Sequence, residues 1–238
     1  MKPNNWTETL LAWFDGFRRE LPWRESHPRN PYHVWVSEIM LQQTRTETVK
    51  GYFHRWMEQF PTIRDLAQAP EDQVLRAWQG LGYYSRVANM QKAAQIVCRQ
   101  YGGQLPADYA ALRALPGIGD YTAGAIASIA FGIPAPAVDG NVLRVFARLD
   151  NSSADITKPA AKREFTTRVL EEMPKERPGP YNEALMELGA LVCLPTVRQS
   201  ARSARWLLSA RAALQAGPNS CRSKRLSRKK RWCRSRPR

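Results

Sequence analysis

The stretch from Leu115 to Asn141, LPGIGDYTAGAIASIAFGIPAPAVDGN, constrains the fold of this chain more than any other. It opens on a turn that cannot be helical, because Pro116 fixes its own φ and the glycines at 117 and 119 permit backbone angles closed to other residues. A run of helix-compatible residues begins at Asp120, a residue type that favours the N-cap. A glycine hairpin before a helix N-terminus presents free N–H groups and partial positive charge, so the turn predicts a phosphate site.

A carboxylate follows this turn at a defined distance. Pro134 and Pro136 should end the helix, and the chain then reaches Asp139-Gly140-Asn141, where a second helix is expected to start. The sequence therefore predicts a phosphate clamp and an acidic side chain joined by one helix.

The remainder of the chain favours an all-α protein. Its 238 residues can form one or two domains with a proper core. The apolar residues recur at helical spacing, with few alternating runs of the kind found in strands. Helices are expected over residues 6–20, 32–48, 49–60, 61–69, 71–79, 85–101, 108–115, 120–133, 141–149, 158–173 and 181–191.

The net charge of +15 is concentrated at one end. Residues 196–238 contain 11 Arg and 3 Lys and no acidic residue, so they carry nearly all of that excess. The preceding residues are almost neutral, and any basic surface there must come from the arrangement of charges.

The N-terminus and the cysteines indicate the compartment. No apolar segment follows Lys2, and no run of apolar residues is long enough to span a bilayer. Four cysteines in a chain of this size fit a reducing compartment better than a disulfide scaffold. We expect an intracellular protein that does not associate with a membrane.

Glu38 is the first candidate for chemistry. It lies in the run VWVSEIML, where its neighbours are almost all apolar. A carboxyl group in apolar surroundings is costly to ionise, so its pKa should rise toward the value that a general acid needs near neutral pH.

The loop GLGYYSR, which begins at Gly80, is a second candidate. Two glycines bracket Leu81, and Tyr83 and Tyr84 follow. Such a loop can present an apolar wedge and aromatic faces to a base stack, although a buried aromatic turn would have the same pattern.

Together these motifs resemble the helix-hairpin-helix DNA glycosylase superfamily. The sequences LPGIGDYTAG and VDGNVLRV match its hairpin and the acidic residue that follows it, and SEIMLQQT matches the catalytic-acid motif of the adenine DNA glycosylases. Those enzymes act on adenine opposite 8-oxoguanine or G. The resemblance covers roughly residues 6–195.

The resemblance implies a fold of two helical lobes that flank a catalytic cleft. Residues 25–135 would form a six-helix barrel-like lobe that includes the helix-hairpin-helix. Residues 1–24 and 136–195 would form the second lobe, of the iron-sulfur type, and residues 196–238 a basic tail. The expected partner is double-stranded DNA, bound by a monomer.

The resemblance also implies roles for individual residues. Glu38 would protonate the adenine, and Asp139 would stabilise the positive charge that develops at C1′ of the sugar, or bond to that atom. The remaining matches are Tyr121 and Asn141 beside that centre; Arg24 and Glu183 at the flipped adenine; Gln42, Gln43, Thr44, Leu81 and Tyr83 at the stack and the opposite base; and Gly117 and Gly119 at the phosphate.

Two carboxyl groups with separated pKa values suit this reaction on chemical grounds alone. Adenine leaves poorly until a ring nitrogen is protonated, and the sugar left behind carries positive charge. Glu38 as a neutral acid and Asp139 as an anion meet both needs. Because they are far apart in the sequence, they would have to meet across a cleft.

Position 121 separates the members of the superfamily. In the endonuclease III-like enzymes a Lys at this position attacks the sugar and leads to strand cleavage. Tyr121 has no amine, so a monofunctional glycosylase is favoured. A thymine-mismatch glycosylase remains an alternative, as do an endonuclease III-like glycosylase and a non-catalytic DNA-binding protein with the same fold.

The resemblance ends after Cys193, which matches the first ligand of a 4Fe-4S cluster. The family pattern continues as C-x6-C-x2-C-x5-C. Here the next cysteines are Cys221 and Cys233, and Cys98 lies in an unrelated helix, so the remaining ligands are not recognisable. The tail is either a basic nucleic-acid arm or the product of an altered reading frame after Pro195; we favour the second, because composition changes abruptly there.

Overall fold

The computed structural model describes residues 6–26 and 28–194, and within them it is helical throughout, without a strand. The predicted all-α class is confirmed. The helices are α1 (Trp6–Phe17), the 3-10 helix η1 (Pro22–Arg24), α2 (Pro31–Leu41), α3 (Thr46–Gln59), α4 (Ile63–Gln68), α5 (Glu71–Trp78), α6 (Ser85–Gln100), α7 (Tyr109–Arg113), α8 (Asp120–Phe131), α9 (Gly140–Leu149), α10 (Pro159–Glu172) and α11 (Pro178–Leu191).

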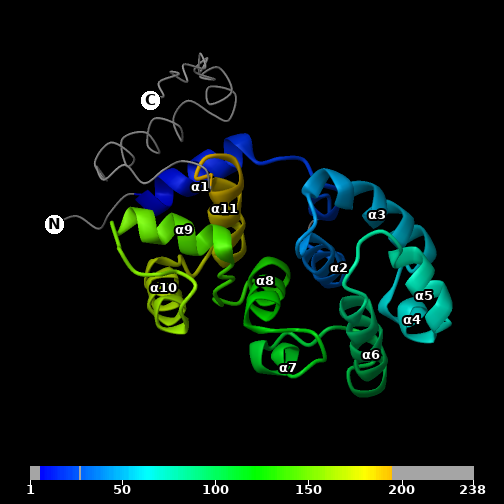
Figure 1. The fold of residues 1–238 in the computed structure, drawn as a ribbon. Coiled ribbons are helices and arrows are strands. Elements are labelled where there is room, and N and C mark those ends of the chain that lie inside the picture. The colour runs from blue at the N-terminus through cyan, green and yellow to red at the C-terminus, as the bar shows by residue number, and fades with distance from the viewer. Residues whose placement is uncertain (1–5, 27, 195–238) are drawn as a thin grey trace, which may run out of the picture.

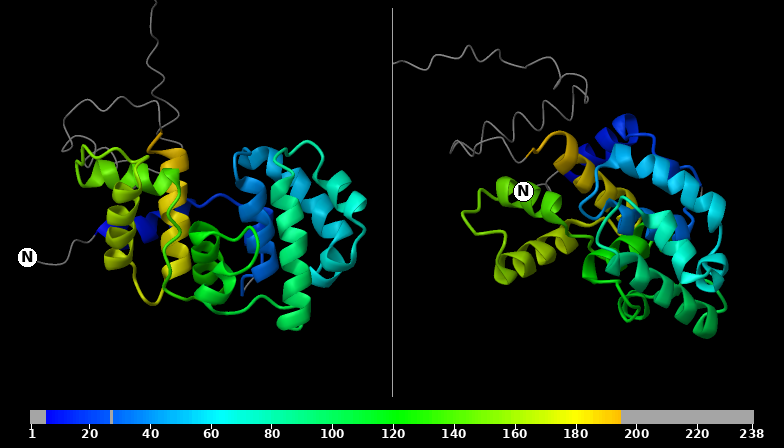
Figure 2. Two further views of the ribbon diagram at one scale, coloured as in Figure 1. Left: turned by 60° about the horizontal axis from the view of Figure 1, so that its bottom comes forward. Right: turned by 45° about the vertical axis from the view of Figure 1, so that its right-hand side comes forward.

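The buried apolar side chains form two cores. One core draws on residues 21–135, and the other on residues 10–14 and 138–193. In Figure 1, α2 to α6 lie on one side of the molecule and α1, α9, α10 and α11 on the other; the left view of Figure 2 shows the same separation. Leu21 and Trp23 belong to the first core, although we expected residues 1–24 in the second lobe, and the lobe boundaries stay a prediction.

Helix α8 lies between these groups and packs against both α2 and α11. Residues 122–128 are all buried, and they are mostly Ala, Gly, Ser and Thr. Small side chains let neighbouring backbones approach closely, and an added Cβ at Gly124 would overlap the carbonyl of Pro136. The run of small residues after the hairpin therefore allows one helix to pack closely against both α2 and α11.

The segment that joins α8 to α9 is held by Asn182, a fully buried residue of α11. Its Oδ1 accepts a hydrogen bond from the Ala137 N–H at 3.2 Å, and its Nδ2 donates to the Ala135 carbonyl at 2.8 Å. Helix α8 ends at Phe131, and Gly132, with a φ of 66°, forms a left-handed C-cap, so the two following prolines do not end the helix as we expected. This anchoring sets where Asp139 begins α9.

One expected helix was wrong. We predicted a helix over residues 32–48, but α2 ends at Leu41 and α3 starts at Thr46. The break lies at Gln43, which adopts a φ of 61°. Glutamine favours helices, so the residue types contain no stop signal there; tertiary contacts of the turn override the local preference.

In the described part of the chain, none of the helices combines the length and apolar character that crossing a bilayer would require.

Candidate active site

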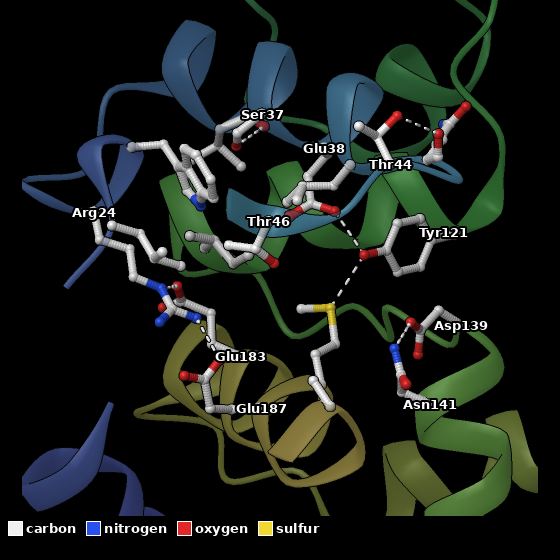
Figure 3. A pocket seen from close by; sticks show the side chains of 18 of the residues that line it. Arg24, Ser37, Glu38, Thr44, Thr46, Tyr121, Asp139, Asn141, Glu183 and Glu187 are labelled. Carbon is white, nitrogen blue, oxygen red and sulfur yellow. Dashed lines mark hydrogen bonds and ion pairs between the residues drawn. The ribbon is translucent and has the colours of Figure 1, made fainter. Parts of the chain in front are cut away.

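A cavity of about 720 Å³ opens between the two groups of helices, and side chains from both line it. Figure 3 shows the acidic, aromatic and basic side chains that converge there. Of the residues predicted for the site, the cavity is lined by Arg24, Glu38, Gln42, Gln43, Thr44, Tyr83, Tyr121, Asp139, Asn141 and Glu183.

Glu38 projects into the cavity from α2 and is only 7% exposed. Burial raises the pKa of its carboxyl group to about 7; the hydrogen bond from Tyr121 acts in the opposite direction, and the negative charge of Asp139 adds to the rise. A carboxyl group with this pKa is partly protonated at neutral pH and can donate a proton. The sequence predicted a raised pKa for Glu38, and its burial in the folded protein is the main cause.

The Tyr121 hydroxyl lies beside Glu38. Its oxygen is 2.6 Å from Glu38 Oε2 and 3.1 Å from Met186 Sδ, which reaches over from α11. Burial raises the pKa of Tyr121 well above its usual value, and the nearby carboxylates act in the same direction. The phenol therefore stays protonated and provides an O–H donor inside the cavity.

Asp139 is the N-cap of α9, and its carboxylate is held in one orientation. Oδ1 accepts a hydrogen bond from the Val142 N–H at 2.9 Å, and Oδ2 accepts one from Asn141 Nδ2 at 2.7 Å. Asn141 is in turn held by Arg144, which donates to its Oδ1 at 2.8 Å. Both carboxyl groups of interest, Glu38 and Asp139, thus line one cavity from different helices.

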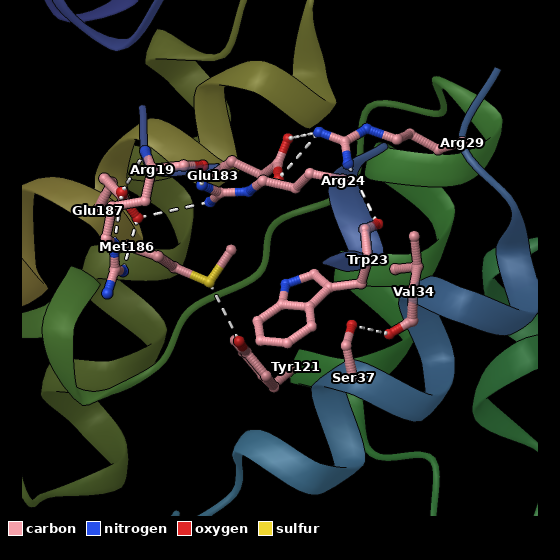
Figure 4. Close-up of polar contacts among 10 residues, drawn as sticks. All are labelled: Arg19, Trp23, Arg24, Arg29, Val34, Ser37, Tyr121, Glu183, Met186 and Glu187. Carbon is pink, nitrogen blue, oxygen red and sulfur yellow. Dashed lines mark hydrogen bonds and ion pairs between the residues drawn. The ribbon is translucent and has the colours of Figure 1, made fainter. Parts of the chain in front are cut away.

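Glu183 on α11 is paired with two arginines. Arg24 Nε donates to its Oε1 at 2.8 Å, and Arg29 donates to its Oε2 at 3.2 Å. Figure 4 shows these side chains running along one wall of the cavity, next to the indole of Trp23. The wall combines an apolar aromatic face with hydrogen-bonding groups, which is the combination that a planar heterocycle requires.

Glu187, one turn after Glu183, also lines the cavity, although it was not among the residues predicted for the site. Arg19 Nε donates to it at 2.7 Å, and Arg24 approaches it at 3.5 Å. Burial by itself would raise the pKa of Glu187, but the hydrogen bond and charges of the two arginines outweigh it and lower the pKa. Two acidic residues four apart in the otherwise apolar run YNEALMELG are a signal that could have identified this pair.

Two loops reach one edge of the cavity: residues 42–44 line it, and Tyr83 lines it from the loop of residues 80–84. Tyr83 is 65% exposed, whereas Leu81 is buried at 6%. We expected Leu81 to be presented at the loop tip. In the structure it packs into the first core, and the exposed side chains of this loop are Tyr83 and Tyr84.

The predicted phosphate clamp lies between α7 and α8. Gly117 has a φ of 77°, and an added Cβ would press on Asn89, so this position requires glycine. Gly119 has an ordinary φ of −88° and open space around it, so its backbone is accessible without needing glycine's freedom. Gly119, not Asp120, is the N-cap; Asp120 forms an ion pair with Arg113 instead.

Cys193 lies at the end of α11, fully buried in the second core. Its Sγ accepts a hydrogen bond from an Arg148 guanidinium nitrogen at 2.9 Å, and its carbonyl accepts one from Arg144 Nε at 2.6 Å. Among residues 6–26 and 28–194, no three His, Cys, Asp or Glu side chains gather in a way that could hold a metal. Cys221 and Cys233 lie outside the described residues, so the residues placed here do not make up a cluster site.

Residues 36–170 match the family described as HhH-GPD superfamily base excision DNA repair protein. The matched region contains Glu38, Tyr121, Asp139 and the glycine hairpin. The chain belongs to this superfamily.

Curated relatives in the superfamily include several adenine DNA glycosylases. The chain is 46% identical to the one from Mus musculus over 193 residues and 45% identical to the one from Homo sapiens over 194 residues. It is 39% identical over 188 residues to the one from Buchnera aphidicola subsp. Baizongia pistaciae. These alignments cover 78% to 79% of the chain but only 38%, 36% and 52% of the relatives, so the chain spans about half their length or less.

Solved structures of the superfamily share the fold. A thermostable thymine-DNA glycosylase aligns with a TM-score of 0.71 at 27% identity, over 81% of this chain and 88% of that one. An endonuclease III trapped as a covalent intermediate with DNA aligns with a TM-score of 0.67 at 26% identity, over 81% and 87%. The helix-hairpin-helix glycosylase fold predicted from the sequence is confirmed.

Proposed function

We propose that this superfamily member is a monofunctional DNA glycosylase that hydrolyses the N-glycosidic bond of adenine opposite 8-oxoguanine or G in duplex DNA. The observation that carries the proposal is one cavity lined by a buried, proton-retaining Glu38 and by an oriented Asp139. The names of its curated relatives support adenine as the base. The protein would act as a monomer, on intracellular DNA.

In the proposed reaction, Glu38 donates its proton to a ring nitrogen of the extruded adenine. The bond between that base and C1′ then breaks, and its electron pair leaves with the base. The Asp139 carboxylate stabilises the positive charge at C1′, either through space or by bonding to it. Water adds to C1′ and returns a proton to Glu38, which restores both groups and leaves an abasic site.

The wall opposite Glu38 would hold the base. Adenine presents ring nitrogens and an exocyclic amine at its edges, and Glu183 and Arg24 offer an acceptor and donors. Their mutual ion pair at 2.8 Å keeps both side chains extended toward the cavity. Trp23 supplies an apolar face next to them.

The residue at 121 supports hydrolysis without strand cleavage. Schiff-base chemistry at the sugar needs an amine, and no lysine is among the described residues that line the cavity. Glu38 and Asp139 alone are enough for the proposed steps. The 4Fe-4S cluster expected from the family has no part in them.

The test is adenine release from a duplex that carries adenine opposite 8-oxoguanine. We expect the full chain to produce abasic sites and Asp139→Asn to lose that activity, because an uncharged amide cannot stabilise the developing cation. Asp72→Asn is the matched control, since Asp72 is an exposed residue of α5 outside the cavity.

Three results would count against the proposal. Abasic sites formed by the Asp139→Asn variant at the wild-type rate would contradict the role of Asp139. Release of thymine opposite G, with adenine left intact, would favour a thymine-mismatch glycosylase, the fold of which the chain shares. Tight binding of the duplex without release of any base would favour a non-catalytic DNA-binding protein.

A further inference from the structure

Arg86, in the first turn of α6, connects the two loops at the cavity rim. One terminal nitrogen donates to the carbonyls of Ile39 at 2.8 Å and Gln42 at 2.6 Å. The other donates to the carbonyls of Leu81 at 2.8 Å and Gly82 at 3.1 Å. A single half-buried guanidinium therefore binds the end of α2 and the loop before α6 at the same time.

The hydrogen bonds from Arg86 to α2 satisfy backbone carbonyls that have no partner within the helix. Helix α2 ends at Leu41, so the carbonyls of its last turn lack intrahelical partners. Arg86 donates hydrogen bonds to two carbonyls in this region, and its positive charge lies at the negative end of the helix dipole. The early end of α2, which sequence patterns did not predict, coincides with this contact.

Both loops contain backbone strain next to Arg86. Gln43 has a φ of 61° and Tyr83 a φ of 47°, and among the described residues the only other non-glycine residue with positive φ is Asn151. Such a conformation is unfavourable for a residue with a side chain and persists only where surrounding contacts impose it. The guanidinium carbon also lies 5.6 Å from the centre of the Tyr83 ring, so Arg86 interacts with the side chain of this strained residue as well as with the loop backbone.

We propose that Arg86 is a positioning residue that locks residues 42–44 and 80–84 into one rigid rim. The locked rim fills the gap left by the extruded adenine and meets the opposite base. This inference depends on the proposed function, because it assigns the rim to that same reaction. Arg86 lines the cavity at its edge and acts through the loops.

The geometry requires arginine in particular. Four carbonyl acceptors from two segments are reached by two nitrogens held in a fixed plane. A lysine ammonium is a single point with three donors and cannot span both segments in this way. Arg86→Lys should therefore behave like Arg86→Met, even though it retains the charge.

The experiment compares single-turnover adenine release from two duplexes, with protein in excess. One carries adenine opposite 8-oxoguanine, and the other carries adenine opposite an abasic analogue, which leaves nothing for the rim to meet. We expect both Arg86 variants to slow release from the first duplex at least about tenfold and from the second about threefold or less, since small misplacements at a site are costly. The control, Arg99→Met, removes an exposed charge from the same helix and should change neither rate.

The ratio of the two rates does not depend on how much of a variant is folded, because an unfolded fraction lowers the active concentration and leaves the rate constant unchanged. Equal slowing on both duplexes, no slowing, or recovery by Arg86→Lys would overturn the inference.

If the wild-type chain releases no adenine, the proposed function fails, and a second readout still decides the role of Arg86. That readout is the fluorescence of 2-aminopurine at the target position, which should rise on binding wild-type protein and rise much less with either variant; an equal rise would overturn the inference.

Discussion

Glu38 illustrates how the surroundings of one residue set its chemistry. Its helix presents apolar neighbours, and the two polar partners within reach, Tyr121 and Asp139, affect its pKa in opposite directions. Burial is the largest influence, and it raises the pKa from an ordinary value of 4.5 to about 7. The same burial that makes this carboxyl a usable acid costs the protein stability whenever the group is ionised.

Replacing Glu38 by Gln should therefore exchange activity for stability. We expect adenine release to fall by about 10²–10⁴-fold, the usual contribution of a general acid. The raised pKa destabilises the folded state increasingly as pH rises from 4.5 to about 7. Glu38→Gln should thus be more stable than wild type by on the order of 3 kcal/mol at pH 8 and by much less near pH 5.

Urea unfolding of both proteins at the two pH values measures this difference. Glu164→Gln, at an exposed position of α10, is the control and should show no pH-dependent gain. A gain of equal size at both pH values would show that Glu38 is not held protonated by its surroundings.

The pH profile of adenine release should report Glu38 directly. The rate should decline as pH rises above about 7, because the donor loses its proton. Tyr121→Phe removes a hydrogen bond that lowers the Glu38 pKa, so the decline should move to higher pH in that variant, whatever its absolute rate. Single-turnover rates between pH 5 and 9 measure the shift, and a decline that stays in place or moves to lower pH would contradict the assignment.

At the scale of helices, close backbone approach positions the catalytic aspartate. Gly189 of α11 faces the start of α9, and an added Cβ would overlap Asn141, the residue that donates to Asp139. Asn182, also on α11, holds the segment before α9 through its hydrogen bonds with the Ala137 N–H and the Ala135 carbonyl. The orientation of Asp139 thus depends on how α11 packs.

Gly189→Ala should accordingly reduce both stability and activity. The overlap falls on the backbone and Cβ of Asn141, which cannot move aside freely, so we expect a loss of about 1–3 kcal/mol in the free energy of unfolding. Adenine release should slow as Asn141 is displaced. Chemical denaturation and single-turnover kinetics measure the two effects.

Gly16→Ala provides the comparison within the same chain. No atom lies within 4 Å of a Cβ added at Gly16, and alanine favours helices over glycine, so no loss of stability is expected in that variant. A Gly189→Ala protein as stable and as active as this control would show that α9 and α11 can separate without consequence.

At the scale of the whole molecule, a network of buried ion pairs joins the two groups of helices. Arg19 and Arg24, both in the segment that connects α1 to α2, bind Glu187 and Glu183 of α11. Arg29, ahead of α2, completes the network at Glu183. Buried charges of this kind are expensive when one partner is removed.

Glu187→Gln should destabilise the protein by on the order of 3 kcal/mol at neutral pH, because Arg19 and Arg24 lose a buried anion. The pKa of Glu187 is lowered in the folded protein, so the stability that it contributes is present above its ordinary value of 4.5 and is lost as pH falls below that value. The difference between wild type and variant should therefore shrink on acidification. Thermal or urea unfolding from pH 3 to 7 measures it, and a difference that does not change with pH would contradict the lowered pKa.

Much of the fold and part of the site could be predicted from local sequence. The glycine hairpin, the acidic residue that begins α9 and the apolar neighbours of Glu38 each depend on residues close together in the chain, where backbone preference and burial follow from residue type. The two rim loops were harder to predict. Gln43 adopts a backbone conformation that its residue type does not suggest, and Leu81 is buried although the glycines around it predicted an exposed loop tip; contacts with α6 and the first core decide both.

The sequence by itself determined the helical class, the hairpin that precedes α8, and the residue types available for acid catalysis and charge stabilisation. Only the tertiary structure decided which of these groups meet. Glu38 and Asp139 line one cavity because the small residues of α8 let α2 and α11 pack on either side of it. Glu183 and Glu187 find their arginines across more than 150 residues of chain; local sequence marks the two acidic residues but not their partners, because electrostatic pairing depends on distance in space.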